Sequence, residues 1–202
     1  IAFAKKYDII VLHDNAYSEL VFDGRHCGSF LHFPGAKKVG VEFNSLSKTY
    51  GLAGARIGFC VGNPEVVKHL KLLKSNMDYG MFLPIQKAAI AAITGDQSCV
   101  ASTRAAYERR RDCLCDGLAS IGWKMEKPEG TMFVWAPIPA GFSDSMEFVK
   151  TLFEKTGVLV TPGSAFGPSG EGHVRMALVQ DEDAIALAVQ RIDASGILKS
   201  EQ

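Results

Sequence analysis

The sequence predicts an α/β protein followed by a smaller α+β unit, and three observations predict it. Short, continuously apolar runs in the first half end in polar residues, as Asp8–Asp14 does, which is typical of strands buried in a parallel sheet. A long amphipathic helical pattern then covers residues 96–121. After Gly122, short strands alternate with helices. We therefore expect two domains, 1–98 and 99–202, with the second beginning inside the long helix.

The elements of the first half follow one another in this order. The residues before Asp8 predict the end of a helix, and apolar runs predict buried strands at 8–14, 38–44 and 56–62 of a mainly parallel sheet. Asn63 and Pro64 form an N-cap and first helical position, which predicts a helix to about Met77. Pro84 opens another helix, to Thr94.

The second half shows a different pattern. Gly122 ends the long helix, and Asp181 caps the last one. We expect strands at 131–136, 158–161 and 173–179, and helices at 144–156 and 181–195. Phe133 and Trp135 are interpreted as core packing, and the run Arg109-Arg110-Arg111 as a solvated helix face.

Composition excludes several classes of function. The 22 basic and 22 acidic residues balance to zero and form no basic block, so we expect no nucleic-acid partner. No apolar run reaches about 18 residues, so we expect no membrane span. The odd number of cysteines, 5, indicates a reducing compartment such as the cytoplasm. Cys113 and Cys115 lie two apart on a predicted helix and do not share a face, so no metal is expected.

The stretch Ser45-Leu46-Ser47-Lys48, followed by Arg56, carries the clearest chemistry. A lysine in a dry pocket has its charged form disfavoured, and its amine can then form a Schiff base with an aldehyde. Hydroxyls and a guanidinium suit a phosphate. An aldehyde and a phosphate on one molecule describe pyridoxal 5′-phosphate. The alternative is a solvated lysine in a polar loop.

Asp14 and Tyr17 form a second group, at the carboxyl end of the first predicted strand. Sites of α/β sheets lie at such strand ends. A buried carboxylate there can keep a pyridine nitrogen protonated, and a tyrosine can donate to a ring oxygen. Alone, this pair is a common strand-end pattern. Its order relative to Ser45, Lys48 and Arg56 is what makes it informative.

Together these residues resemble the class I/II pyridoxal-phosphate-dependent aminotransferases of fold type I. The resemblance covers almost the whole chain, and the motifs that carry it are His13-Asp-Asn-Ala-Tyr-Ser-Glu-Leu20, Asn44-Ser-Leu-Ser-Lys-Thr-Tyr-Gly-Leu-Ala-Gly-Ala-Arg-Ile-Gly58, Ser75-Asn-Met-Asp-Tyr-Gly80, Glu129-Gly-Thr-Met-Phe-Val-Trp135, Pro162-Gly-Ser-Ala-Phe-Gly167 and His173-Val-Arg-Met-Ala-Leu178. Within the family, the segment from Ser75 looks most like the branch of LL-diaminopimelate and aspartate aminotransferases.

The resemblance implies a role for each site residue. Lys48 would form the Schiff base and move the proton at the substrate α-carbon. Asp14 would pair with the pyridine nitrogen and Tyr17 with the ring hydroxyl. Arg175 would hold the substrate carboxylate, a bidentate pairing that also fixes the α-carbon over the lysine. The phosphate would be held by Ser45, Arg56 and Ser47.

The resemblance also implies what lies beyond these residues. Family members are much longer, so we interpret the chain as lacking the N-terminal half, which brings a phosphate-binding helix end and a ring-stacking aromatic residue. Residues 1–98 would be the C-terminal part of the large cofactor-binding domain, and 99–202 the small domain. The parent would be a homodimer that uses amino acids and 2-oxo acids, whereas this piece would be weakly active or inactive.

Two other functions stay open. A β-lyase that cleaves a carbon–sulfur bond would use the same Lys48 and Asp14, since both reactions begin by removing the α-proton. The aminotransferase-like sensor half of a transcriptional regulator is the second, although no basic segment here supports it.

Overall fold

The computed structural model describes residues 1–199, and the chain divides into two compact units, 1–104 and 105–202. The division falls inside helix α6 (Ser98–Ser120), slightly later than the predicted boundary but in the same helix. Assignment of the units to a large and a small domain stays a prediction. None of the described helices is both long and apolar enough to cross a bilayer.

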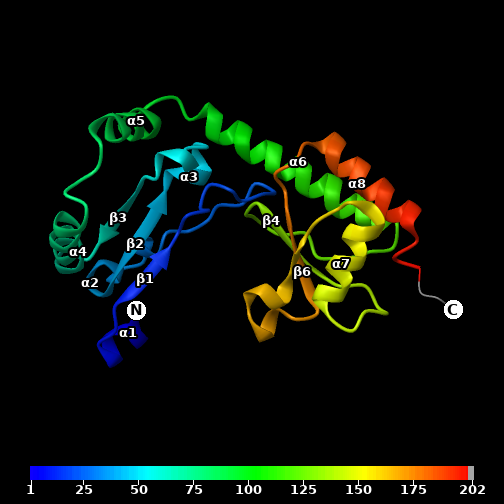
Figure 1. The fold of residues 1–202 in the computed structure, drawn as a ribbon. Coiled ribbons are helices and arrows are strands. Elements are labelled where there is room, and N and C mark those ends of the chain that lie inside the picture. The colour runs from blue at the N-terminus through cyan, green and yellow to red at the C-terminus, as the bar shows by residue number, and fades with distance from the viewer. Residues whose placement is uncertain (200–202) are drawn as a thin grey trace. The chain divides into compact units, whose positions relative to one another are not determined.

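The first unit contains a three-stranded sheet in the order β1-β2-β3 (Figure 1). Strand β2 (Gly40–Ser45) pairs in parallel with β1 (Val11–Asp14) and antiparallel with β3 (Gly58–Gly62). The expected mainly parallel sheet is therefore mixed in these residues. Strand β1 ends at Asp14 and strand β3 begins at Gly58, and both positions lie at the end of the sheet where β2 also ends. The predicted site residues on or next to these strands therefore lie at one end of the sheet.

The first unit also contains several helices, and residues 15–29 form turns and irregular backbone between β1 and the first 3-10 turn. The helices are α1 (Ala2–Tyr7), α2 (Ala36–Val39), α3 (Leu46–Thr49), α4 (Pro64–Met77) and α5 (Leu83–Thr94), with 3-10 turns η1 (Phe30–His32) and η2 (Ala53–Ala55). The predicted start of α4 is confirmed, since Asn63 Oδ1 accepts the backbone N–H groups of Glu65 at 3.0 Å and Val66 at 3.2 Å. The helix at the start of the chain is also confirmed.

The prediction that the first strand is buried on both faces is wrong for the described residues. Leu12 in the middle of β1 is 64 % exposed, and Phe59 and Val61 of β3 are exposed as well. The physical reason is that β1 and β3 are the edges of a small sheet, and Leu12 lines an open groove with residues of α4. The apolar run correctly indicated a strand, but burial depends on which segments cover it.

The second unit packs helices on one face of an antiparallel sheet ordered β4-β6-β5. Strand β6 (His173–Ala177) lies between β4 (Phe133–Pro137) and the short β5 (Thr161–Pro162). Helices α7 (Ser145–Thr156) and α8 (Glu182–Ser195) pack against each other, and 3-10 turns η3 (Gly163–Phe166) and η4 (Pro168–Gly170) follow β5. The predicted cap of α8 is confirmed, with Asp181 accepting from Ala184 N.

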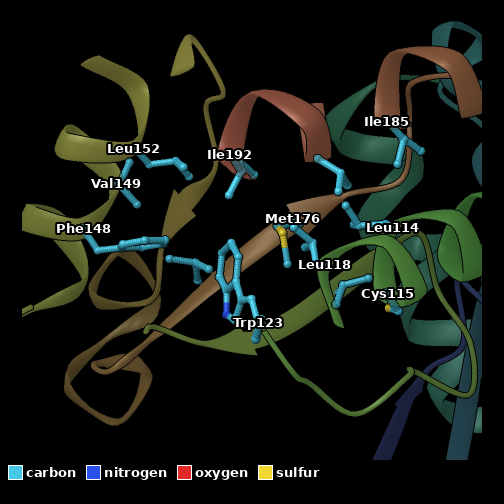
Figure 2. Packing of buried hydrophobic residues seen from close by; sticks show 14 of the residues in the cluster. Leu114, Cys115, Leu118, Trp123, Phe148, Val149, Leu152, Met176, Ile185 and Ile192 are labelled. Atoms are coloured by element: carbon cyan, nitrogen blue, oxygen red, sulfur yellow. The ribbon is translucent and has the colours of Figure 1, made fainter. Parts of the chain in front are cut away.

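The core of this unit is one apolar cluster (Figure 2). Phe148 of α7 is fully buried, with its ring edge-on to Trp123 at 5.2 Å between centroids. The Trp123 indole donates to the carbonyl of Pro137 at 2.8 Å, so its one polar atom is satisfied. Val134 and Ala136 of β4 turn inward and have no exposed surface.

Two sequence-based interpretations need correction, that of Phe133 and Trp135 and, in part, that of the arginine run, in which Arg109 is exposed as expected. Trp135 is 41 % exposed and shares the outer face of β4 with Phe133, because successive side chains of a strand alternate and Val134 and Ala136 take the core face. Arg111 is only 2 % exposed rather than solvated. Its guanidinium pairs with Asp112 at 2.9 Å and donates to Pro128 O, so its burial is compensated.

Candidate active site

The segment that carries Lys48 is a helical turn, α3, and not a polar loop. Strand β2 ends at Ser45, whose Oγ accepts the Ser47 N–H at 3.1 Å and so caps α3. Leu46 points inward and is fully buried, which anchors the turn. The next two residues, Ser47 and Lys48, are half-buried. The turn thus fixes the backbone position of Lys48 and leaves its side-chain amine accessible.

The amine of Lys48 makes no hydrogen bond or ion pair with the residues described, 1–199. A dry pocket around it, which the chemical argument required, is not complete in these residues, because the side chain is only half-buried. A lysine without an ionic partner on a capped helical turn nevertheless has the freedom to react that an ion-paired lysine lacks.

Asp14 lies at the same end of the sheet. It ends β1 opposite Phe43, and because Cα partners point to the same face, Asp14 shares a face with Phe43 and with Ser45. Its carboxylate is exposed and has no partner among residues 1–199, so the expected burial is not found in these residues. Tyr17 follows in the turn after β1, where its carbonyl accepts the Leu20 N–H at 2.9 Å.

Arg56 comes to this end of the sheet through the antiparallel pairing of β2 and β3. Ser45 is opposite Gly58, and Leu46 N donates to Ile57 O at 3.2 Å, so the chain just before β3 runs beside α3. The backbone of Arg56 is left-handed, with φ 51°. Such strain costs about 1–2 kcal/mol and is common at functional sites. One N–H donates to Ala53 O at 3.0 Å, and the exposed guanidinium keeps its other donors.

Sequence reasoning missed a buried carboxylate on the other face of the same strands. Glu42 is 4 % exposed and faces His13, its partner on β1. The groups that surround its two oxygens are His13 Nδ1 at 3.0 Å, Asn15 Nδ2 at 3.1 Å, Asn44 Nδ2 at 3.0 Å, Ser29 Oγ at 2.6 Å and Phe30 N at 3.0 Å. The signal was a glutamate inside an apolar strand, which must be hydrogen-bonded to be tolerated.

The electrostatics of Glu42 follow from those bonds. Burial by itself favours the neutral acid, but the hydrogen bonds from Asn44, Ser29, Asn15 and His13 stabilise the anion and bring its pKa down to about 2. The ionised carboxylate therefore ties β1, β2 and the segment at Ser29 together. It supports the strand ends that carry Asp14 and Ser45 without itself facing them.

Arg175 belongs to the second unit, on the outer face of β6. Its guanidinium carbon lies 4.2 Å from the ring centroid of Phe133 and 4.4 Å from that of Phe166. Within residues 1–199 it makes no hydrogen bond or ion pair. A half-buried guanidinium with free N–H groups is suited to bind a carboxylate.

Among the described residues, no three His, Cys, Asp or Glu side chains gather as a metal site would require. Cys113 is half-buried and Cys115 buried on α6, and burial raises the pKa of both thiols. Neither thiol lies among the residues predicted for the site.

Known proteins match the chain along nearly its full length. The family model "Aminotransferase class I and II" matches residues 1–192. An LL-diaminopimelate aminotransferase of Moorella thermoacetica is 46 % identical over 192 residues, which is 95 % of this chain and 49 % of that protein. The glutamate-pyruvate aminotransferase AlaC of Escherichia coli is 48 % identical over 196 residues, 96 % of this chain and 48 % of that protein.

Solved structures agree with this. Substrate-bound BacF of Bacillus subtilis superposes with a TM-score of 0.91 at 40 % identity, covering 96 % of this chain and 49 % of that one. A probable N-succinyldiaminopimelate aminotransferase of Thermus thermophilus superposes with a TM-score of 0.88 at 34 % identity, covering 96 % of this chain and 52 % of that one. The chain spans about half the length of the relatives it matches. From the model match and these identities, the chain belongs to the class I and II aminotransferase family.

Proposed function

We propose that this chain carries the lysine end of a pyridoxal-phosphate site in an enzyme that transfers amino groups from amino acids to 2-oxo acids. The observation that carries the proposal is the convergence of Lys48, Asp14 and Arg56 on one end of the β1-β2-β3 sheet. Family membership supplies the reaction class.

The donor set suits the cofactor. Ser45 and Ser47 offer hydroxyls and Arg56 a guanidinium to a phosphate, and the Ser45 hydroxyl proton stays available because its oxygen acts as the helix cap. When bound, the cofactor would supply an aldehyde for a Schiff base with Lys48 and a pyridine ring that accepts the electrons of the α-carbon. Asp14 is the carboxylate suited to keep a ring nitrogen protonated.

The chain's own residues then have distinct tasks. Lys48, once displaced by substrate, would take the proton from the substrate α-carbon and deliver it to carbon C4′ of the cofactor. Tyr17 would donate to the ring oxygen. Arg175 would hold the substrate carboxylate in a fixed orientation, which keeps the α-carbon in reach of the lysine.

The relatives guide the rest of the proposal. Several of them are named LL-diaminopimelate aminotransferase, so we favour a donor of that kind, an amino acid with a polar, charged side chain. The whole protein would work as a homodimer in the cytoplasm. Residues 1–98 would close the large domain of this enzyme, and residues 99–202 would form its small domain.

Trapping the lysine tests the proposal directly. The 202-residue chain is incubated with pyridoxal phosphate, reduced with borohydride and mapped by peptide mass spectrometry. We expect the reduced adduct at Lys48 well before it appears at the exposed Lys37, and Lys48→Ala should abolish the early adduct while Lys37→Ala leaves it intact. Equal labelling of the two lysines would contradict a selective site.

Turnover separates the remaining possibilities. We expect this chain alone to transfer amino groups weakly or not at all, and robust transfer by the purified chain would contradict that expectation. With the corresponding full-length enzyme, amino transfer should require a 2-oxo acid. Release of pyruvate and ammonia from cystathionine without an acceptor would indicate the β-lyase instead.

A further inference from the structure

We propose that Phe133 and Phe166 are positioning residues that clamp the guanidinium of Arg175 between their rings and so present its N–H groups to a carboxylate. The inference rests on the proposed function, since the carboxylate is that of the substrate. Neither phenylalanine would touch the reacting atoms. Their task is to fix the orientation of the arginine that does the binding.

The sheet of the second unit builds one side of the clamp. Residues 133 and 135 of β4 and residues 173 and 175 of β6 share the outer face, because the core face is taken by their buried neighbours. Arg175 is directly opposite Trp135, and Phe133 is its diagonal neighbour. Long side chains reach across that diagonal, and the Phe133 ring centroid lies 4.2 Å from the guanidinium carbon.

The turns after β5 build the other side. Gly163 and Gly170 touch through their backbones so closely that a Cβ on Gly163 would lie 1.9 Å from the Gly170 carbonyl oxygen. This contact closes the η3–η4 segment, which begins next to β5 and presents Phe166. The Phe166 ring is braced by Trp135, edge-on at 5.6 Å. Trp135 in turn stacks on His173 at 5.4 Å.

The guanidinium carbon of Arg175 thus lies over two aromatic rings, one from β4 and one from η3. A cation over an aromatic face is attracted by the ring quadrupole. The N–H groups of a guanidinium lie in its plane, so rings on its faces do not block them, and they match a carboxylate in a bidentate manner. Arg104 and Arg111 show the contrast, since their edges already bind Glu19 and Asp112. Arg175 has no such partner within residues 1–199.

Holding the side chain in advance has a clear effect on affinity. A free arginine loses much rotamer freedom when it binds, and a clamped one has lost that freedom already. The two rings also cover part of the guanidinium against water, and Arg175 is half-buried. We therefore expect carboxylate binding at Arg175 to depend on aromatic rings at 133 and 166, and not only on apolar bulk there.

The test uses the 202-residue chain labelled with ¹⁵N-arginine, with the Arg175 Nε–Hε signal assigned through Arg175→Lys. Its Nε relaxation should report a side chain about as rigid as the backbone, in contrast with the exposed Arg191. Titration with sodium acetate, at constant ionic strength with chloride, should shift the Arg175 signal to saturation. Phe133→Leu and Phe166→Leu should each weaken acetate binding roughly twofold to fivefold. Each should also increase the mobility of the Arg175 Nε–Hε bond.

Two further variants isolate the aromatic contribution. Phe166→Tyr keeps an aromatic ring and, unlike Phe166→Leu, should preserve both the rigidity of the Arg175 side chain and its affinity for acetate. Phe153→Leu removes an exposed phenylalanine from α7 and should change neither. An Arg175 side chain as mobile as Arg191, or leucine variants that bind acetate as the unchanged chain does, would overturn the clamp. A rigid Arg175 that ignores acetate would keep the clamp and instead contradict its proposed role in binding substrate.

Discussion

Replacing Glu42 by glutamine tests how the strand ends that carry Asp14 and Ser45 are held. Glutamine keeps the shape of the side chain but turns one acceptor oxygen into an NH₂ donor. That donor would face groups that themselves donate, Ser29 Oγ and Phe30 N, which now lie 2.6 and 3.0 Å from Glu42 Oε2. The variant thus removes the charge and leaves buried donors without an acceptor.

The magnitude follows from the pKa of Glu42. Its hydrogen bonds bring the pKa from 4.5 to about 2 in the folded chain. A depression of that size corresponds to about 3 kcal/mol of folding free energy at neutral pH. Because the folded pKa lies below the unfolded one, this stabilisation is fully present above about pH 4.5 and disappears as the pH falls toward about 2.

We therefore expect Glu42→Gln to lower the free energy of unfolding of the first unit by about 3 kcal/mol at pH 7, with the difference shrinking toward pH 2. The assay is urea unfolding followed by NMR at a series of pH values. Amide signals of Val41 and Phe43 report on the first unit, and that of Leu118 reports on the second. Reading the units separately avoids treating the chain as a single two-state system.

Glu65→Gln is the matched control. The Glu65 side chain is 70 % exposed and makes only a long ion pair with Lys68, at 3.6 Å. Such surface pairs contribute about 0–1 kcal/mol, so this variant should unfold almost as the unchanged chain does. If Glu42→Gln were equally harmless, or if its effect were as large at pH 2 as at pH 7, the hydrogen-bonded anion would not be the source of stability.

Two further predictions concern the second unit and the thiols. Phe148→Ala removes a fully buried ring that packs edge-on against Trp123 and should cost about 3–5 kcal/mol, read from urea unfolding at the Leu118 amide. Burial raises the pKa of Cys115 to about 11, so iodoacetamide at pH 8 should alkylate the exposed Cys27 and Cys99 first. Early labelling of Cys115 in the folded chain, detected by mass spectrometry, would contradict its burial.

Local signals in the sequence predicted local structure well. Asn63 and Asp181 were assigned as helix caps from residue type and position alone, and both side chains accept the expected backbone N–H groups. A cap is decided within one turn of chain, so neighbouring residues contain the information. The same holds for the helical turn at Ser45, since the capping hydroxyl lies only two residues before the N–H that it accepts.

Faces of strands were predicted less well, because alternation does not say which face meets the core. Strand β4 carries apolar residues on both faces, and the small Val134 and Ala136 were overlooked in favour of Phe133 and Trp135. Only the helices packed over the sheet decide between them. Glu42 was missed for a related reason, since the side chains that satisfy it come from other segments, including Ser29 and His13.

Two sets of charged residues in this chain have different surroundings. Glu42 and Arg111 are buried and fully engaged with neighbours, so their charges hold backbone segments in place. Asp14 and Lys48 lie on or directly after the strands that Glu42 holds, and Arg175 lies on β6; none of the three has a hydrogen-bonding or ionic partner within residues 1–199. A charged side chain that is already ion-paired must break that pair before it binds a ligand, whereas an unpaired one binds without that cost. This difference is what we expect if Lys48, Asp14 and Arg175 serve a ligand, as proposed, while Glu42 and Arg111 serve the fold.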